Sequence, residues 1–155
     1  MKLKTGVALA ILITTLSVTL GHGQVVDSSW VKIIQLTAPA IVIIETEKNL
    51  GSGFFVRADG TFVTNYHVIA DAKEITVKFN TGETYRRAYV LSSDEQRDIA
   101  ILRIEATEVP ILPLANSNES QVGEEVLLIG APRGLEQTVS NGIISGIRML
   151  EAARR

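Results

Sequence analysis

The chain has 155 residues, of which 46% are hydrophobic and 21% are charged, so it holds about one globular domain and is not intrinsically disordered. Its 15 Lys and Arg residues stand against 17 Asp and Glu residues, and only 5% of the residues are aromatic; this balance lacks the basic surface and the stacking rings of a protein that binds nucleic acid. The chain contains no cysteine, which excludes a disulfide framework, a thiolate zinc site, an iron–sulfur cluster and a cysteine nucleophile.

The first 23 residues have the pattern of a secretory signal peptide. Two lysines precede an uncharged apolar stretch, 7–20, and the small residues Gly21 and Gly23 follow it. A basic start, an apolar centre and small residues at the cleavage site are typical of such leaders. We therefore predict a leader over residues 1–23, cut before Gln24, and an exported protein, periplasmic or secreted, with no membrane association afterwards. The alternative is an uncleaved membrane anchor, for which the apolar stretch is shorter than the ~20 residues that a bilayer requires.

Short runs of β-branched and aromatic residues make up most of the remaining chain. Turn signals at Ala58-Asp59-Gly60 and at Asn80-Thr81-Gly82 separate successive runs. Apolar and polar residues alternate between residues 74 and 79, which is the period of a strand with one buried face. The pattern predicts a helix at 28–36 and strands at 41–46, 53–57, 61–64, 74–79, 84–91, 99–104 and 125–129.

These strands predict an all-β fold. Many short antiparallel strands leave exposed edges unless the sheet closes on itself. We therefore expect an antiparallel β-barrel over residues 24–133, with only short helices between its strands. The residues that we expect to point into its core are Ile75, Val77, Ile99, Ile101, Val126 and Leu128.

Residues 134–155 do not fit a six-stranded barrel. Two runs, 137–139 and 142–146, flank the turn signal Ser140-Asn141-Gly142 and predict two further strands that have no partner in the barrel. We interpret this segment as the start of an architecture that these residues do not complete.

Outside the predicted leader, a single histidine is available for acid–base chemistry near neutral pH. His22 lies within the leader, which leaves His67. A lone histidine beside a strand is most often a structural or surface residue. His67, however, stands in Thr64-Asn65-Tyr66-His67-Val68-Ile69, where a buried strand gives way to a helical turn. Such a rigid platform can hold the imidazole toward a cleft.

Asp98 directly precedes the apolar strand predicted at 99–104, where its carboxylate would be partly desolvated. An aspartate at such a boundary is often a solvated turn residue. The alternative is a pair with His67, in which a buried carboxylate accepts Nδ1–H and leaves Nε2 free to take a proton from a hydroxyl nucleophile. We name His67 and Asp98 as candidate catalytic residues, and we assign no metal or cofactor site.

A series of short segments is specific in its order and spacing, although each segment alone is weak. They are Gly51-Ser52-Gly53-Phe54-Phe55, Asp59-Gly60, Thr64-Asn65-Tyr66-His67-Val68-Ile69, Asp98-Ile99-Ala100-Ile101-Leu102, Gly123 with Val126, Gly130-Ala131-Pro132, Gly134-Leu135, and Thr138-Val139 with Gly142-Ile143-Ile144-Ser145. From about residue 33 to residue 149 the sequence thereby resembles the HtrA/Deg group of trypsin-like serine endopeptidases.

The resemblance implies a fold of two six-stranded Greek-key barrels with the active site in the cleft between them. Residues 24–133 would form the first barrel, and residues 134–155 would be the truncated start of the second. It also implies that His67 is the general base and Asp98 the acid that orients it. Trimers are common in the family, and no motif here decides whether this chain forms a homo-oligomer.

The third catalytic element of the family is absent from the sequence. Its nucleophile stands in a Gly-Asn-Ser-Gly-Gly segment, whose backbone N–H groups also form the oxyanion hole, and no such segment occurs here. Ser140 and Ser145 lie only 42 and 47 residues beyond Asp98, in the segment of the two further strands, and Ser52 belongs to the Gly-Ser-Gly-Phe strand of the family. None of the three is a credible substitute. A phosphate-binding loop at Gly51-Ser52-Gly53 is rejected because Val56 stands where its third glycine should be.

Two interpretations from different classes follow. In the first, the chain is part of an exported serine endopeptidase that hydrolyses polypeptide substrates, and it is inactive without the segment that supplies the nucleophile. In the second, it is a non-catalytic β-barrel that acts as a binding or decoy module; completion by another polypeptide is a third arrangement. We favour the first, because unpaired strands after Gly134 would expose an edge and the apolar residues Ile143 and Ile147.

Overall fold

The computed structural model describes residues 28–130 and 138–148, and the leader predicted over residues 1–23 lies outside them. Within these ranges, no helix is both long and apolar enough to cross a membrane. The elements in chain order are α1 (Ser28–Thr37), the 3₁₀ helix η1 (Ala38–Ala40), β1 (Ile41–Glu45), β2 (Leu50–Phe55), β3 (Thr61–Thr64), α2 (Tyr66–Ile69), β4 (Thr76–Phe79), β5 (Thr84–Tyr85), β6 (Tyr89–Asp94), β7 (Ile99–Arg103), the 3₁₀ helix η2 (Ser117–Glu119), β8 (Glu125–Gly130) and β9 (Thr138–Ile143).

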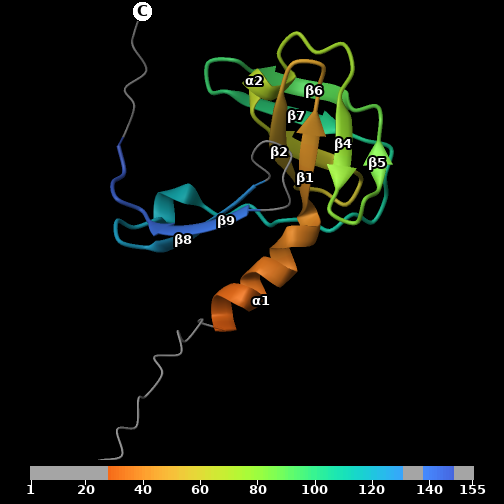
Figure 1. Ribbon diagram of the computed structural model, residues 1–155. Coiled ribbons are helices and arrows are strands. Elements are labelled where there is room, and N and C mark those ends of the chain that lie inside the picture. The colour runs from red at the N-terminus through yellow and green to blue at the C-terminus, as the bar shows by residue number, and fades with distance from the viewer. Residues whose placement is uncertain (1–27, 131–137, 149–155) are drawn as a thin grey trace, which may run out of the picture.

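Seven of these strands form one antiparallel sheet that curls on itself (Figure 1). They lie in the order β5-β4-β1-β2-β3-β7-β6. Strands β1, β2 and β3 pair consecutively, and β4 returns to lie beside β1, which is the strand arrangement of a Greek key. The predicted all-β, Greek-key architecture with short helices is therefore confirmed.

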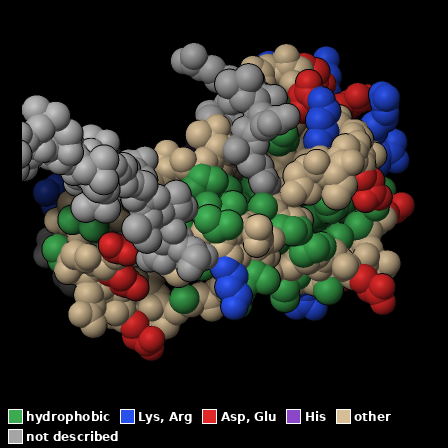
Figure 2. All heavy atoms as spheres, turned by 60° about the horizontal axis from the view of Figure 1, so that its bottom comes forward, with side chains coloured by type: hydrophobic (Ala, Val, Ile, Leu, Met, Phe, Trp, Pro, Cys, Tyr) green, Lys and Arg blue, Asp and Glu red, His purple; other side chains and the backbone are tan. Residues whose placement is uncertain are grey.

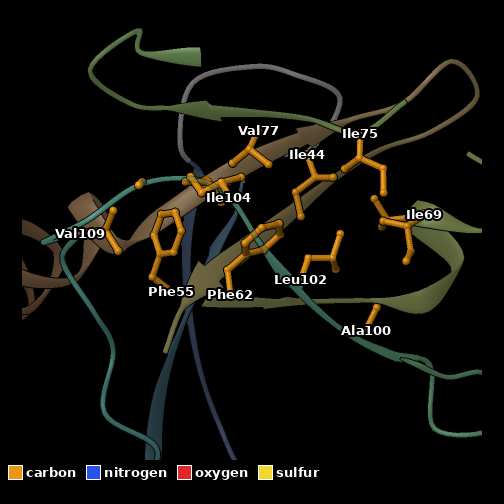
Figure 3. Packing of buried hydrophobic residues seen from close by; sticks show 13 residues of the cluster. Ile44, Phe55, Phe62, Ile69, Ile75, Val77, Ala100, Leu102, Ile104 and Val109 are labelled. Carbon is orange, nitrogen blue, oxygen red and sulfur yellow. The ribbon is translucent and has the colours of Figure 1, made fainter. Parts of the chain in front are cut away.

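Hydrophobic side chains fill the inside of the curled sheet (Figure 3). Phe55 of β2 and Phe62 of β3 are fully buried, and their rings meet edge to face with centroids 5.8 Å apart. The ring of Phe79 stacks on Phe55 at 5.3 Å. Ile75 and Val77 are buried as predicted. Because aromatic rings bury large areas and prefer these offset geometries, they join β2, β3 and β4 in one core.

The inner face of strand β7 is the face that was predicted to point outward. Ile99 and Ile101, which were expected inside, are 42% and 36% exposed, so that prediction is wrong. Ala100 and Leu102 are fully buried instead. The cause is the register between β3 and β7, which sets Phe62 opposite Leu102. Residues directly opposite in an antiparallel pair share a face, so the buried Phe62 ring fixes the inner face of β7.

Strand β8 exists as predicted, but it does not belong to the seven-stranded sheet. It pairs with β9 in a separate two-stranded sheet, with Val126 opposite Gly142 and Leu128 opposite Ser140. Val126 and Leu128 are 39% and 73% exposed, contrary to the core prediction. A single strand also replaces the two unpaired strands expected around Ser140-Asn141-Gly142. Pairing with β8 therefore outweighs the turn preference of this tripeptide.

The remaining elements follow the predicted order, with one split. The helix expected at 28–36 is α1. The strand expected at 84–91 is instead two strands, because β5 pairs with β4 whereas β6 pairs with β7. The chain therefore crosses from one edge of the sheet to the other within a stretch whose hydrophobic pattern is nearly continuous.

Candidate active site

The pairing of β3 with β7 brings the two candidate residues together. Thr64, at the end of β3, lies opposite Ala100 of β7. The chain leaves β3 through Asn65 into the four-residue helix α2, which carries His67, and it enters β7 directly after Asp98. The segment that follows one strand and the residue that precedes the other therefore lie at the same edge of the sheet.

His67 and Asp98 meet through two hydrogen bonds. Asp98 Oδ2 lies 2.7 Å from His67 Nδ1, and Asp98 Oδ1 accepts the backbone N–H of His67 at 2.8 Å. Both carboxylate oxygens thus face one residue, which sets the plane of the carboxylate relative to the imidazole. The pair is open to solvent, with 69% of the His67 side chain and 42% of the Asp98 side chain exposed. The buried carboxylate of the sequence analysis is therefore a half-exposed one.

These hydrogen bonds keep the carboxylate ionised. The backbone N–H of His67 and, after it, the His67 ring lower the pKa of Asp98 below its ordinary value of 3.8. An ionised carboxylate can only accept, so a neutral His67 ring carries its hydrogen on Nδ1. Nε2 then has its lone pair available, and it has no hydrogen-bond partner among the residues that the structure describes. The ring can accept a proton at Nε2, and the Asp98 carboxylate can then stabilise the positive charge of the imidazolium.

A tight turn, rather than packing, places Asp98. Its backbone is left-handed, with φ 53°, a conformation that aspartate tolerates better than most residues. Its N–H donates to the carbonyl of Glu95 at 3.2 Å. The carboxylate of Asp94 accepts the backbone N–H of Arg97 at 3.0 Å and pairs with its guanidinium at 2.8 Å. The turn between β6 and β7 is thus held by its own side chains.

Helix α2 lies so close to β2 that only glycine fits beneath it. A Cβ atom at Gly51 would lie 2.5 Å from Cγ2 of Val68, a buried residue of α2. A Cβ atom at Gly53 would lie 2.9 Å from the carbonyl oxygen of Val63 on β3. The Gly-Ser-Gly segment therefore allows the close approach of α2 and β3 to β2. This packing explains the glycines without a phosphate ligand.

Two asparagine side chains contact the pair, and neither was predicted to have a role. Asn65 Nδ2 lies 3.2 Å from Oδ2 and 3.2 Å from the backbone oxygen of Asp98. Asn49 Nδ2 donates to the backbone oxygen of His67 at 2.9 Å. The position of Asn65, between a strand and a helix, is one that asparagine favours. That preference and its place in the motif around His67 are the signals in the sequence that could have drawn attention to it.

An apolar groove of about 610 Å³ opens beside Asp98 and Asn65. It lies between α1, the outer face of the curled sheet and β8, with Trp30, Phe54 and Val63 among its lining residues. Figure 2 shows hydrophobic side chains gathered on the side of the molecule that carries these elements. Asp98 and Asn65 therefore stand at the rim of an apolar surface.

The candidate serines lie on or beyond the strands. Ser52 is paired opposite Ile43 on β1, and Ser140 is paired opposite Leu128 on β8. Ser145 is exposed beyond the end of β9. Across residues 28–130 and 138–148, no three His, Asp or Glu side chains gather in a way that could hold a metal ion.

The comparisons with known protein sequences agree on one family. The family described as the trypsin-like peptidase domain matches residues 51–154. The mitochondrial serine protease HTRA2 of Bos taurus is 41% identical over 125 residues, which cover 73% of this chain and 27% of that protein. A probable periplasmic serine endoprotease, DegP-like, of Halomonas elongata is 41% identical over 103 residues, which cover 66% and 22%. The chain thus spans about a quarter of the length of these relatives.

Solved structures agree with the sequences. The HtrA-type protease AlgW with tripeptide matches with a TM-score of 0.74 at 33% identity, over 80% of this chain and 42% of that one. The serine endoprotease from Yersinia pestis matches with a TM-score of 0.71 at 36% identity, over 76% and 44%. The fold built around His67 and Asp98 is therefore a trypsin-like one, and the chain belongs to the trypsin-like peptidase family and to its HtrA/Deg group, as the resemblance implied.

Proposed function

We propose that this chain supplies the histidine–aspartate part of the catalytic triad of an exported serine endopeptidase. His67 is the general base, and Asp98 orients and stabilises it. The observation that carries the proposal is the 2.7 Å contact between His67 Nδ1 and an ionised Asp98 that also accepts the backbone N–H of His67. This geometry directs Nε2 away from the carboxylate and leaves it available to a hydroxyl group.

The reaction follows from that geometry. His67 Nε2 takes the proton of a serine hydroxyl while the serine oxygen attacks the carbonyl carbon of a peptide bond. The imidazolium gives the same proton to the leaving amine, and the acyl-enzyme ester is then hydrolysed by a water that His67 activates in the same way. Asp98 remains ionised throughout, because its pKa lies below its ordinary value.

The serine of this proposal is not one of the 155 residues. Ser52 and Ser140 occupy paired positions in strands. The nucleophile and the oxyanion donors therefore come from a Gly-Asn-Ser-Gly-Gly segment outside this sequence, as part of a second barrel that β8 and β9 begin. The boundary expected between the first barrel (24–133) and the start of the second (134–155) falls between β8 and β9, which pair in one sheet; we therefore propose that the second barrel starts at β8.

The substrate class is polypeptide. One of the similar structures is named as a protease with a tripeptide, and the similar relatives are named as proteases. In this proposal, the side-chain preference at the scissile bond is set by the second barrel.

A fluorophosphonate probe tests the assignment of the nucleophile. A polypeptide of these 155 residues is expected to show no labelled serine and no cleavage of casein above a His67→Ala control, because it lacks the serine and the oxyanion donors. Addition of a second-barrel fragment from a similar protease, with its Gly-Asn-Ser-Gly-Gly segment, is expected to restore both labelling and cleavage.

Two other results would contradict the proposal. Labelling of Ser52, Ser140 or Ser145 in the 155-residue polypeptide, lost in His67→Ala, would make the chain an enzyme with its own nucleophile. No activity after addition of a fragment that binds stably would favour the non-catalytic binding or decoy module.

Export is the second part of the proposal, and its support is the basic and apolar pattern of residues 1–23. The similar DegP-like relatives are named as periplasmic. Mass analysis of the protein from an exported fraction is expected to give an N-terminus close to Gln24. An intact Met1 in a membrane fraction would instead identify the segment as an anchor.

A further inference from the structure

The side-chain amide of Asn65 contacts Asp98 at two atoms. Its Nδ2 lies 3.2 Å from the backbone oxygen of Asp98 and 3.2 Å from carboxylate Oδ2. One NH₂ group carries two hydrogens and can donate to both oxygens at once. A donor that bridges the carbonyl and the carboxylate of the same residue restrains the side-chain torsion between them.

We propose that Asn65 is a positioning residue: its carboxamide fixes the side chain of Asp98 so that Oδ2 faces Nδ1 of His67. The role rests on the proposed function of the pair. It goes beyond that function because it explains how an aspartate at the molecular surface is held in one orientation.

Asp98 needs such a restraint because packing does not provide one. Its side chain is 42% exposed, and it stands on a turn with a left-handed backbone. The turn fixes the backbone through Asp94 and Arg97, and the hydrogen bonds to the Asp98 carboxylate come from other residues. The side chain is thus held by hydrogen bonds alone, from His67 and Asn65.

The Asn65 side chain does not cap helix α2, so it is free to contact Asp98. Asn65 occupies the flanking position before α2, with φ −77° and ψ 143°, where asparagine usually caps the helix with its side chain. Its side chain makes no capping hydrogen bond here. The amide is instead directed across the sheet edge to Asp98, which lies 33 residues away in sequence.

The test uses the 155-residue chain and the two ring nitrogens of His67. At neutral pH, ¹⁵N NMR distinguishes the Nδ1–H tautomer from the Nε2–H tautomer, and a His67→Ala spectrum separates the signals from those of His22. We expect Asn65→Ala to lower the ratio of Nδ1–H to Nε2–H by about two- to tenfold, the factor that corresponds to one net hydrogen bond. The unaltered chain should hold mainly the Nδ1–H form.

Asn65→Asp separates positioning from a structural role. Aspartate has the same shape and suits the position before a helix equally well, but it has no N–H to donate. We expect the tautomer ratio to fall at least as far as in Asn65→Ala, because a second carboxylate also repels Asp98. Asn80→Ala, a change at an exposed turn residue, serves as the matched control and should leave the ratio unchanged.

An unchanged ratio in folded Asn65→Ala, or a ratio preserved in Asn65→Asp, would overturn the role. A measurement without substitution covers the case in which the variants fail to fold. In the unaltered chain, the Asn65 side-chain amide should exchange with water at least about tenfold more slowly than that of Asn80. Equal exchange would also overturn the role.

Failure of this inference is distinguishable from failure of the proposed function. The tautomer ratio is read in a chain without a nucleophile, so it does not depend on proteolysis. In the enzyme completed with a second-barrel fragment, Asn65→Ala should lower kcat and leave KM unchanged. If the completed enzyme showed no proteolysis but the tautomer ratio fell in Asn65→Ala as expected, the peptidase proposal would be contradicted and the positioning role of Asn65 would stand.

Discussion

Leu102→Asp is expected to abolish folding of the chain. Leu102 is fully buried on β7, opposite the buried Phe62. Loss of a buried leucine side chain costs about 2–5 kcal/mol, and an unpaired buried carboxylate adds several kcal/mol more. Since domains are stable by only about 5–15 kcal/mol, the soluble protein should be lost, and any that remains should melt without a cooperative transition in circular dichroism.

The adjacent substitution Ile101→Asp is the matched control. Ile101 is on the same strand, but its side chain is 36% exposed on the outer face. Its replacement should cost about 1–2 kcal/mol, from lost strand preference and half-buried contact, and leave a cooperative unfolding transition. If Ile101→Asp failed to fold while Leu102→Asp melted cooperatively, the register between β3 and β7 would be wrong.

In the enzyme completed with a second-barrel fragment, Asp98→Asn is expected to lower kcat by about 10⁴-fold. The amide oxygen of the new residue would take the position of Oδ1, which accepts the backbone N–H of His67. Its NH₂ group would then face Nδ1 and hold the ring in the tautomer with hydrogen on Nε2. A ring protonated at Nε2 cannot accept the serine proton. Casein hydrolysis measured against substrate concentration separates kcat from KM.

Asp71→Asn provides a control with the same chemical change. Asp71 also has a left-handed backbone, with φ 57°, and asparagine tolerates that conformation. Its carboxylate lies 3.8 Å from Lys48 at the surface, and such exposed pairs contribute little. The variant should retain nearly full kcat. An Asp98→Asn enzyme with more than about a tenth of the original kcat would contradict the role assigned to Asp98.

The sequence predicted where strands occur better than which way they face. Ile99, Ala100, Ile101 and Leu102 are all apolar, so alternation alone allows either face of β7 to be the inner one. The large branched isoleucines favoured the wrong choice. The structure decides it through Phe62, a contact between strands about 40 residues apart that no local pattern contains. The same limit applies to β9, whose pairing with β8 overrides its turn signal.

The candidate site shows a different limit. His67 could be named because it is the single histidine outside the predicted leader, and Asp98 because it precedes an apolar strand; the motifs around both resemble a known family. Their distance depends on the pairing of β3 with β7, which is not visible in the sequence. Asn65 was part of a quoted motif, but its role depends on the direction of one side chain, and the same residue type would suit a simple helix cap.

The position of the pair in the chain sets the order in which the site assembles during synthesis. The strands that hold His67 and Asp98 together, β3 and β7, are complete by residue 103, and the backbone N–H of Leu112 donates to the carbonyl of Phe55 on β2 at 2.9 Å. Domains fold as units from the N-terminus as they leave the ribosome. The pair and the strands that hold it therefore all precede β8 in the chain, so the proton acceptor can be oriented before β8 and β9 have paired.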